Sequence, residues 1–588
     1  MARRLPPVDI VIVGMGWTGG IMARELGPTG QKIVVLERGG PRSTEEDFAV
    51  PLIRDELRFA QRTDLMMDTA KDTVSVRNNP TEEALPMRRL GSFLPGEGVG
   101  GAGAHWNGVS WRWADHDLKI RSTYEARYGA KFIPDDMPLC DWGVSYAELE
   151  PYYEKFEYIA GVSGKAGNLR GRLQPGGNPF EGARKRDYPL PPLTENYAGR
   201  LFTEATKGLG LHPFARPTAN ASRPYVNPDG MQLGQCQYCG FCERFGCESN
   251  AKGSPNITVI PVALKNPNVE LRNWSWVQKV MLDSTGKKAV GVAYVNVQTG
   301  EELEQPADLV ILCAYGLSNV HLMLLSGIGK PYDPQSGVGV IGSHYAYQGT
   351  ASQQMFFEGK NFNPFLATGG LGAIIDDYHA DQGFDRGPLG YIGGSTITAG
   401  GSGGRPIGYR PTPAGTPAWG SDWKRATAKW DQSALSVNAL GAVMPHRQNF
   451  LDLDPTYRNR FGQPLLRMTF DFKDNDQKQN RHAAELCTQI GKAMNPTRVN
   501  PAFYPRSWSV VPYQSTHNTG GAIMGREPGT SAVNTWLQSW DVSNVFVVGA
   551  SAFPHNSAYN PTGPVAALAY RTAEAIRDRY LKRPGLLA

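Results

Sequence analysis

The chain has 588 residues, of which 40% are hydrophobic and 20% charged, a composition typical of a globular protein with roughly two to four domains. Its 60 Lys and Arg residues interleave with 55 Asp and Glu residues, which leaves a formal net charge of +5 and no basic block of the kind that follows a nucleic-acid backbone. No apolar run approaches the roughly 18–20 residues of a membrane-spanning helix. The totals therefore argue against a nucleic-acid-binding protein and exclude a transmembrane chain.

The N-terminal segment predicts a β-α-β unit. Residues 8–14 (VDIVIVG) form a β-branched run, residues 21–27 (IMARELG) have helical spacing, and residues 32–37 (KIVVLE) form a second strand. The arginine pair of MARRLPPVDI resembles a twin-arginine export signal, but the apolar stretch after it is too short and leads directly into the folded unit. We therefore expect no signal peptide, and we expect any export to depend on another chain.

A dinucleotide fingerprint lies inside this unit. The pattern Gly14-x-Gly16-x-x-Gly19 separates the first strand from the helix, and Glu37 ends the second strand. Glycines at this spacing let the backbone approach a pyrophosphate at the helix N-terminus, and the acid binds a ribose hydroxyl. Because a glutamate here disfavours a ribose that carries a 2′-phosphate, FAD and NAD remain as cofactors.

A second glycine cluster and two less regular blocks follow. Residues 96–108 (GEGVGGAGAHWNG) predict a loop on which a flat ring or a diphosphate lies against the backbone. Residues 116–225 are loop-rich and aromatic, with their clearest helix at 149–161, and residues 341–511 are again irregular. Strands are predicted within 277–297, 307–314 and 544–551, and helices over 317–327 and 564–581. This order predicts one nucleotide-binding domain built from separated segments, and a second domain for the substrate.

Four of the seven cysteines lie in residues 236–247 (CQYCGFCERFGC), at Cys236, Cys239, Cys242 and Cys247. A zinc site usually separates two Cys-x-x-Cys pairs by a longer stretch, and two local disulfides would close very small strained loops. Closely spaced thiolates on one loop are typical of an iron-sulfur cluster, which is the favoured interpretation. The isolated cysteines are expected to be core residues; they are Cys140, Cys313 and Cys487.

Five segments together resemble the glucose-methanol-choline (GMC) oxidoreductases, FAD enzymes that oxidise alcohols and sugars. They are VDIVIVGMGWTGG, GVGGAGAHWNG, CAYGLSNVHLMLLSGIG, THNTGGAIMG and VGASAFPHNSAYNPTGPVAALAY. The resemblance implies an α/β fold, with a Rossmann-like FAD-binding domain and a substrate domain that contains a mainly antiparallel sheet. The FAD domain is expected to comprise 1–115, 226–340 and 512–588, with an iron-sulfur loop at 232–255, and the substrate domain 116–225 and 341–511.

The resemblance also assigns site residues. Those that hold FAD are Gly14, Gly16, Gly19, Glu37, Gly98, Gly100, Gly101, Asn107, Gly108, Gly549 and Pro561. His517 falls on the catalytic histidine, expected to take the hydroxyl proton while hydride leaves for the flavin, and Asn560 would hold the same oxygen. His555 is the second choice for the base. The N-terminus of the predicted helix at 564 would face the flavin and stabilise its reduced, anionic form.

His105 lies in a context similar to that of the histidine that some GMC enzymes join covalently to the flavin. The resemblance therefore implies either a covalent attachment point at His105 or a histidine that packs beside the ring. A subgroup of bacterial membrane-associated GMC dehydrogenases has a cysteine-rich insertion at the position of Cys236–Cys247. In that subgroup three cysteines hold a 3Fe-4S cluster, and which of the four here is spare stays open.

An iron-sulfur cluster passes electrons singly, which favours a dehydrogenase over an oxidase. The resembling subgroup implies a small subunit with a twin-arginine signal, a membrane-anchored multihaem cytochrome c subunit, and a place on the periplasmic face of the inner membrane. The implied reaction oxidises D-gluconate to 2-dehydro-D-gluconate. Fructose, sorbitol, 2-ketogluconate, oxidation of a glucoside at C3, a flavin oxidase and a non-catalytic relay subunit are the alternatives. A carboxylate substrate favours a cation in the pocket, and Arg112, Arg447 and Lys424 are the candidates.

Overall fold

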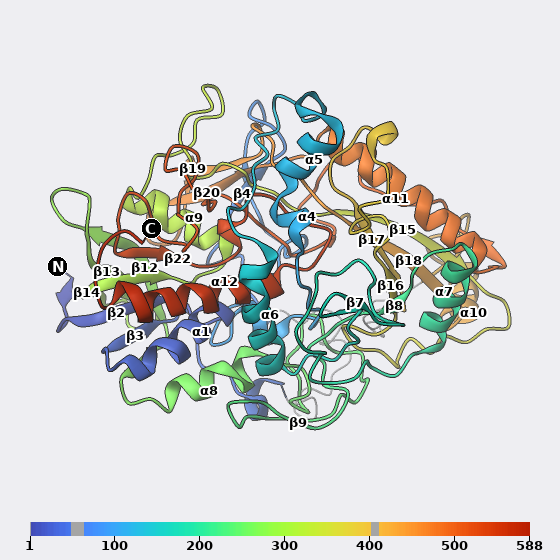
Figure 1. Cartoon of the computed structure of the whole chain (residues 1–588), viewed down its shortest axis with the longest axis horizontal. Coiled ribbons are helices and arrows are strands. Elements are labelled where there is room, and N and C mark those ends of the chain that lie inside the picture. The colour runs from blue at the N-terminus through green and yellow to red at the C-terminus, as the bar shows by residue number, and fades with distance from the viewer. Residues whose placement is uncertain (1, 49–63, 401–410, 588) are drawn as a thin grey trace.

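The computed structural model describes residues 2–48, 64–400 and 411–587. Its largest element is an eight-stranded sheet in which β11, β3, β2, β14, β13 and β12 are neighbours, and β1 and β22 also pair with β14. The strands are β1 (Arg3–Arg4), β2 (Val8–Val13), β3 (Ile33–Leu36), β11 (Val269–Arg272), β12 (Ser275–Leu282), β13 (Ala289–Asn296), β14 (Glu302–Leu312) and β22 (Val545–Val547). The first, middle and last parts of the chain thus meet in one sheet (Figure 1).

Helices cover this sheet because its parallel core strands are apolar on both faces. All four side chains of β3 are buried, as in sheets whose two faces are both covered. Helix α1 (Trp17–Leu26) packs against α8 (Val259–Leu264) and α12 (Thr562–Ala575), and α9 (Gly316–Ser326) packs against β12. The predicted β-α-β unit is present as β2, α1 and β3, joined by parallel pairing of β2 with β3.

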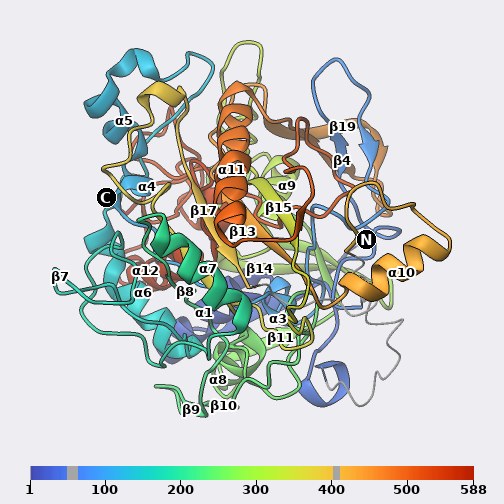
Figure 2. The same ribbon diagram turned by 90° about the vertical axis from the view of Figure 1, so that its right-hand side faces the viewer.

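The blocks predicted to be irregular contain regular structure, and that part of the prediction is wrong. A six-stranded sheet in the order β21, β15, β18, β17, β16, β8 is antiparallel at every pairing within the described residues, which agrees with the antiparallel sheet expected for the substrate domain. Its strands are β8 (Phe214–Ala215), β15 (Gly349–Phe356), β16 (Ala373–Ile375), β17 (Ser395–Ala399), β18 (Ala434–Gly441) and β21 (Arg498–Val499). The twenty-residue helix α11 (Asp474–Ala493) packs on β15 and β18 (Figure 2).

A third, four-stranded sheet joins segments far apart in the sequence. It has the order β19 (Phe450–Arg458), β20 (Pro464–Thr469), β4 (Ser75–Arg77) and β5 (Leu85–Pro86), with β4 parallel to β20. Strands from both expected domains therefore share this sheet, and the domain boundaries stay a prediction.

The remaining elements lie around these sheets. They are α3 (Ala102–His105), α4 (Asp115–Leu118), α5 (Ile120–Tyr128), α6 (Tyr146–Ala160), α7 (Tyr197–Gly208), α10 (Ser421–Trp430), β6 (Asn168–Leu169), β7 (Arg172–Leu173), β9 (Tyr225–Val226) and β10 (Gln232–Leu233), with short 3₁₀ or π turns at Gly27–Thr29, Thr44–Phe48, Ala130–Phe132, Pro255–Ile257, Gly387–Leu389, Ala550–Ala552 and Ile576–Tyr580. Helix α6 begins at a capping box between Ser145 and Glu148 and packs against α12. Within the described ranges, every helix is too short or too polar to cross a bilayer.

Candidate active site

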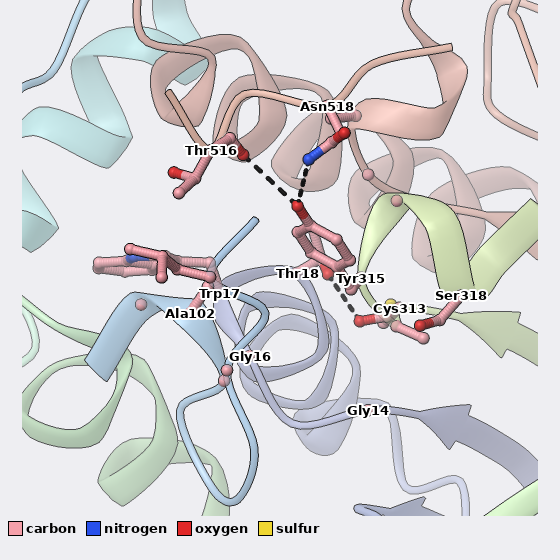
Figure 3. A pocket seen from close by; sticks show the side chains of 18 of the residues that line it. Gly14, Gly16, Trp17, Thr18, Ala102, Cys313, Tyr315, Ser318, Thr516 and Asn518 are labelled. Carbon is pink, nitrogen blue, oxygen red and sulfur yellow. Dashed lines mark hydrogen bonds between the residues drawn. The ribbon is translucent and has the colours of Figure 1, made fainter. Parts of the chain in front are cut away.

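A cavity of about 430 Å³ extends between the ends of β2 and β3 and the loops that precede and follow β22 (Figure 3). The predicted site residues that line it are Gly14, Gly16, Glu37, Gly101, His105, Asn107, His517, Gly549, Asn560 and Pro561. The structure therefore brings both ends of the chain and its middle segments to one hollow, as an extended cofactor requires.

The turn between β2 and α1 is built from backbone alone. A Cβ on Gly14 would lie 2.8 Å from the carbonyl oxygen of Cys313, and one on Gly19 would lie 1.9 Å from that of Gly14. Gly19 thus lies under the turn, outside the cavity, where it lets α1 approach the strand. No side chain caps the start of α1 at Gly16, so the first amides of the helix are free to meet an anion.

Glu37 lies directly after β3 and its carboxylate is buried. It accepts hydrogen bonds from the backbone amides of Met15, at 2.9 Å, and Gly39, at 3.0 Å. Burial raises the pKa of this carboxyl group above its ordinary value, although the amide hydrogen bonds oppose the shift. The acid is therefore held in place against the glycine turn before any ligand arrives.

The second glycine segment closes the cavity from the other side. Gly98, Gly100, Gly101 and Gly108 all have positive φ angles, but of these only Gly101 lines the cavity. A Cβ on Gly100 would lie 2.0 Å from Oδ1 of Asn256, so the neighbouring glycines shape the loop and leave its backbone to face the hollow.

His105 and Asn107 are the polar side chains of this segment that face the cavity. His105 is buried and its Nε2 has no hydrogen-bond partner. Burial, aided by the nearby cations Lys252 and Arg244, lowers the pKa of His105 to about 3. The imidazole is neutral at physiological pH. Asn107 turns its Oδ1 to the amide of Val109, 3.0 Å away.

His517 and Asn560 meet in the cavity. Nδ2 of Asn560 donates to Nε2 of His517 over 3.1 Å, and burial lowers the pKa of His517 to about 4. Nδ1 of His517 lies 2.5 Å from Oε1 of Gln348, whose Nε2 donates to the backbone carbonyls of Ser557 and Tyr559. Because these carbonyls orient the amide, Nδ1 carries the ring proton and Nε2 keeps its lone pair.

Gln348 is a site residue that the sequence did not reveal. It lies immediately before β15, in the block predicted to be irregular, and no motif surrounds it. Only the fold brings it to His517.

Tyr315 is a second unpredicted residue, and it connects two walls of the cavity. Its hydroxyl accepts a hydrogen bond from Nδ2 of Asn518 over 2.6 Å and donates to the carbonyl oxygen of Thr516 over 3.4 Å. Nearby, Oγ1 of Thr18 donates to the carbonyl oxygen of Cys313 (Figure 3). The loop that carries His517 is therefore tied to the start of α9.

Several predicted residues lie away from the cavity. His555 is fully buried, and its Nδ1 accepts a hydrogen bond from Nε1 of Trp142 over 3.2 Å. Arg112 is buried among carboxylates and binds both oxygens of Glu157, and Lys424 and Arg447 are exposed. None of these three candidate cations lines the described cavity. The only Lys or Arg among the described lining residues is Arg38, which pairs with Asp72 at 2.6 Å.

The cysteine loop adjoins the second glycine segment. All seven cysteines fall in the described ranges and are free; Cys236 and Cys242 are buried, Cys247 is partly exposed and Cys239 is exposed. The amide of Arg244 donates to the carbonyl oxygen of His105 over 2.8 Å.

A buried lysine strengthens this junction. Nζ of Lys252 donates to the carbonyl oxygens of Trp106, Cys242 and Phe245 at 2.6–2.8 Å. The cysteine loop and the His105 loop therefore share one buried cation. As expected, Cys313 and Cys487 are buried, while Cys140 is partly exposed.

Comparisons with known proteins agree with this geometry. Models described as GMC oxidoreductase match residues 225–345 and 445–569. The gluconate 2-dehydrogenase flavoprotein of Pantoea cypripedii is 48% identical over 100% of this chain and 96% of its own length. The fructose dehydrogenase large subunit of Gluconobacter japonicus is 25% identical over 98% and 99%. A crystal structure of pyridoxine 4-oxidase from Mesorbium loti, 16% identical, covers 97% of this chain and 99% of its own with a TM-score of 0.58.

The fold, the cavity and these likenesses define an FAD-dependent oxidoreductase that acts on CH–OH groups. The chain belongs to the GMC oxidoreductase family. The residues present fit FAD: the backbone of the turn leaves no room for a side chain at Gly14 or Gly19, the start of α1 is uncapped, and Glu37 lies beside the turn.

Substitution of Glu37 tests cofactor binding, because its carboxylate lies beside the glycine turn. We expect Glu37→Ala to retain flavin about tenfold less well or worse, because each hydrogen bond to a charged group contributes about 1.5–3 kcal/mol. The ratio of flavin to protein absorbance after gel filtration measures this, whether or not the flavin later becomes covalently attached. Glu45→Ala, at an exposed residue, is the matched control and should keep full flavin content. Equal flavin content in both variants would contradict the assignment.

Proposed function

We propose that the chain is the catalytic flavoprotein subunit of a dehydrogenase that oxidises D-gluconate to 2-dehydro-D-gluconate. The observation that carries the proposal is the His517–Asn560 pair in the cavity, with an unprotonated Nε2 at its centre. The 48% identity to a relative named gluconate 2-dehydrogenase flavoprotein supports the choice of substrate.

The proposed residue roles follow from hydrogen-bonding capacity. FAD held at this site would supply the hydride acceptor for oxidation of the alcohol carbon. Nε2 of His517 accepts the hydroxyl proton, since its lone pair is the only ring acceptor left once Nδ1 donates to Gln348. Asn560 donates to the substrate oxygen without titrating, and in the absence of substrate it donates to Nε2. His555 is not assigned this role because it lies outside the cavity.

Two sets of residues are proposed to hold the FAD. The ADP half binds at Gly14, Gly16 and Glu37, and the flavin binds along Gly101, Asn107, Gly549 and Pro561. The other predicted glycines act by shaping the backbone around the cavity; they are Gly19, Gly98, Gly100 and Gly108. Helix α12 begins at Thr562, beside Pro561 in the cavity wall, so its positive end can stabilise negative charge on the ring.

His105 is proposed as the covalent attachment point of the flavin. Its neutral ring and its unpartnered, buried Nε2 leave a nitrogen lone pair available for a bond to carbon. The alternative, a histidine that only packs by the ring, leaves a buried polar atom without a partner, which is costly.

An iron-sulfur cluster of the 3Fe-4S type is proposed for Cys236, Cys239, Cys242 and Cys247, with one of the four spare. The donor set suits such a cluster, because four thiols lie on one loop and Lys252 is close enough to interact electrostatically with Cys239, Cys242 and Cys247. The contact of this loop with the His105 segment supports electron transfer between the two cofactors.

The proposed assembly follows from that electron path. Electrons pass to a membrane-anchored multihaem cytochrome c subunit, and a small subunit with a twin-arginine signal exports the complex to the periplasmic face of the inner membrane. One relative is itself named a large subunit, which supports a multi-subunit enzyme.

Oxidation of a neutral sugar or polyol is the second candidate. Arg38 is the only Lys or Arg among the described lining residues, and Asp72 already neutralises it. The described part of the cavity therefore recognises hydroxyl groups more readily than a carboxylate.

A donor panel tests the substrate. The purified complex, supplied anaerobically with an artificial one-electron acceptor, should be reduced by D-gluconate at least tenfold faster than by fructose, sorbitol, 2-ketogluconate or a methyl glucoside. Turnover with neutral donors only would replace gluconate by the second candidate. Oxygen consumption with substrate alone, at the rate of acceptor reduction, would instead indicate an oxidase. No turnover with any donor would favour a relay subunit.

Cofactor analysis tests the attachment and the cluster. The wild-type complex should contain iron and acid-labile sulfide and should keep its flavin through acid precipitation. His105→Ala should release the flavin, and Cys242→Ser and Cys247→Ser should lower the iron content, whereas Cys487→Ser, in the core of the antiparallel-sheet region, should not. Wild-type protein without iron would disprove the cluster, and flavin release from wild type would disprove the covalent bond.

The acid limb of kcat/KM tests the base. The folded-state pKa of His517 is lowered to about 4, so the ring is neutral above that value and activity should stay level until the pH falls through about 4. Gln348→Glu should move this limb upward by roughly 1–3 pH units, because a carboxylate at Nδ1 stabilises the imidazolium. Gln348→Leu should lower kcat about tenfold or more without moving the limb upward.

His517→Ala is the reference for that profile. It should keep bound flavin but lose flavin reduction by gluconate. Retained turnover in His517→Ala, or an unmoved limb in Gln348→Glu, would refute the assignment.

A further inference from the structure

A histidine-aspartate-histidine cluster lies behind the loop that carries Asn560. His116 and Asp117 belong to the one-turn helix α4, and His379 lies in the segment between β16 and β17. Asp117 and His379 are buried and His116 is nearly so. None of the three is among the described residues that line the FAD cavity, so the cluster is separate from the proposed catalytic residues.

The three side chains direct their ligand atoms at a common point. Oδ2 of Asp117 lies 3.1 Å from Nε2 of His116, and Oδ1 lies 3.2 Å from Nε2 of His379. The two Nε2 atoms are 3.4 Å apart. Ligand atoms about 2.0–2.1 Å from one tetrahedral ion are roughly 3.3–3.4 Å from each other. The spacing of the two nitrogens therefore matches one edge of such a tetrahedron, and one ligand atom from each of the three side chains lies within 4.8 Å of the other two.

The hydrogen bonding of the cluster is incomplete without an ion. Oδ2 of Asp117 is buried and has no well-formed hydrogen-bond partner among the described residues. Two imidazole nitrogens face each other at 3.4 Å, and each lies beside a different oxygen of the Asp117 carboxylate. A cation between the three atoms would satisfy all of them at once.

A fourth ligand is available on the open side. Oγ of Ser557 lies 3.0 Å from Nε2 of His379. A cavity of about 20 Å³, large enough for one water molecule, is lined by His116, Asp117 and His379. Arg386 also lines this cavity, but its guanidinium already donates to backbone carbonyls, including that of His379 at 2.7 Å.

We propose that His116, Asp117 and His379 bind one divalent first-row metal ion, best represented by Zn²⁺, with Ser557 or a water as the fourth ligand. Two imidazoles and a carboxylate form a ligand set that suits such ions. The ion has a structural role. It joins α4 to the segment that carries His379, and Nε2 of His379 lies 3.0 Å from Oγ of Ser557 in the loop that follows β22. In that loop Ser557 and Tyr559 supply the carbonyls that orient Gln348.

Metal analysis of the holoenzyme tests the proposal independently of substrate and activity. Protein produced with added zinc should contain about one zinc per chain, and X-ray absorption should report only nitrogen and oxygen ligands. Sulfur ligands would instead place the zinc in the cysteine loop. Asp117→Asn and His379→Gln should reduce the zinc to below about a tenth of that amount. His212→Gln, at an exposed histidine that pairs with Asp377, should leave it unchanged.

Thermal unfolding of the wild-type chain covers the case in which the variants do not fold. After treatment with a chelator, added Zn²⁺ should raise Tm in proportion to the logarithm of its concentration. Wild-type protein without zinc and without a Tm shift would overturn the proposal and leave a charged hydrogen-bonded triad. A Tm shift that persists in Asp117→Asn would overturn it as well.

Discussion

The backbone of Met15 is the point on which the cofactor site depends. Its amide donates to Glu37 at 2.9 Å, and its carbonyl oxygen accepts from the amide of Gly100 at 2.7 Å. These two hydrogen bonds join the first glycine turn, the end of β3 and the second glycine segment. The segments approach so closely that no side chain fits between them at Gly39, where a Cβ would lie 2.2 Å from the backbone nitrogen of Gly98.

Further hydrogen bonds connect the second glycine segment to the cysteine loop. From Gly100 the chain continues within a few residues to His105, whose carbonyl oxygen binds the amide of Arg244 in the cysteine loop. Lys252 then holds Trp106, Cys242 and Phe245 through three carbonyl oxygens, one for each of its N–H groups. A buried ammonium group is costly unless fully bonded, so its complete set of partners makes this junction rigid.

Local patterns in the sequence predicted the part of the site that is itself local. The β-α-β unit, Glu37 and the α9 and α12 helices follow from apolar periodicity and glycine spacing within short windows. The antiparallel sheet itself was expected from the family resemblance, but its individual strands were not located, because strands such as β15 (GTASQQMF) and β18 (ALSVNALG) use small and polar residues, which carry a weak strand signal. The positions of Gln348 and His379 beside the site could not be predicted from local patterns, because their partners His517 and His116 lie 169 and 263 residues away.

Burial gives His517 a weak basicity that suits its surroundings. In the absence of negative charge nearby, desolvation alone lowers its pKa to about 4, and the neutral ring stands ready with its lone pair towards Asn560. In the role proposed for His517, the negative charge that develops on a substrate oxygen as it loses its proton would raise the pKa of the imidazole and so oppose the effect of burial. Gln348 contributes because a neutral amide at Nδ1 fixes the tautomer without adding a charge, whereas a carboxylate there would protonate the ring before substrate arrives. In this proposal the imidazole of His517 therefore stays unprotonated until a substrate hydroxyl transfers its proton.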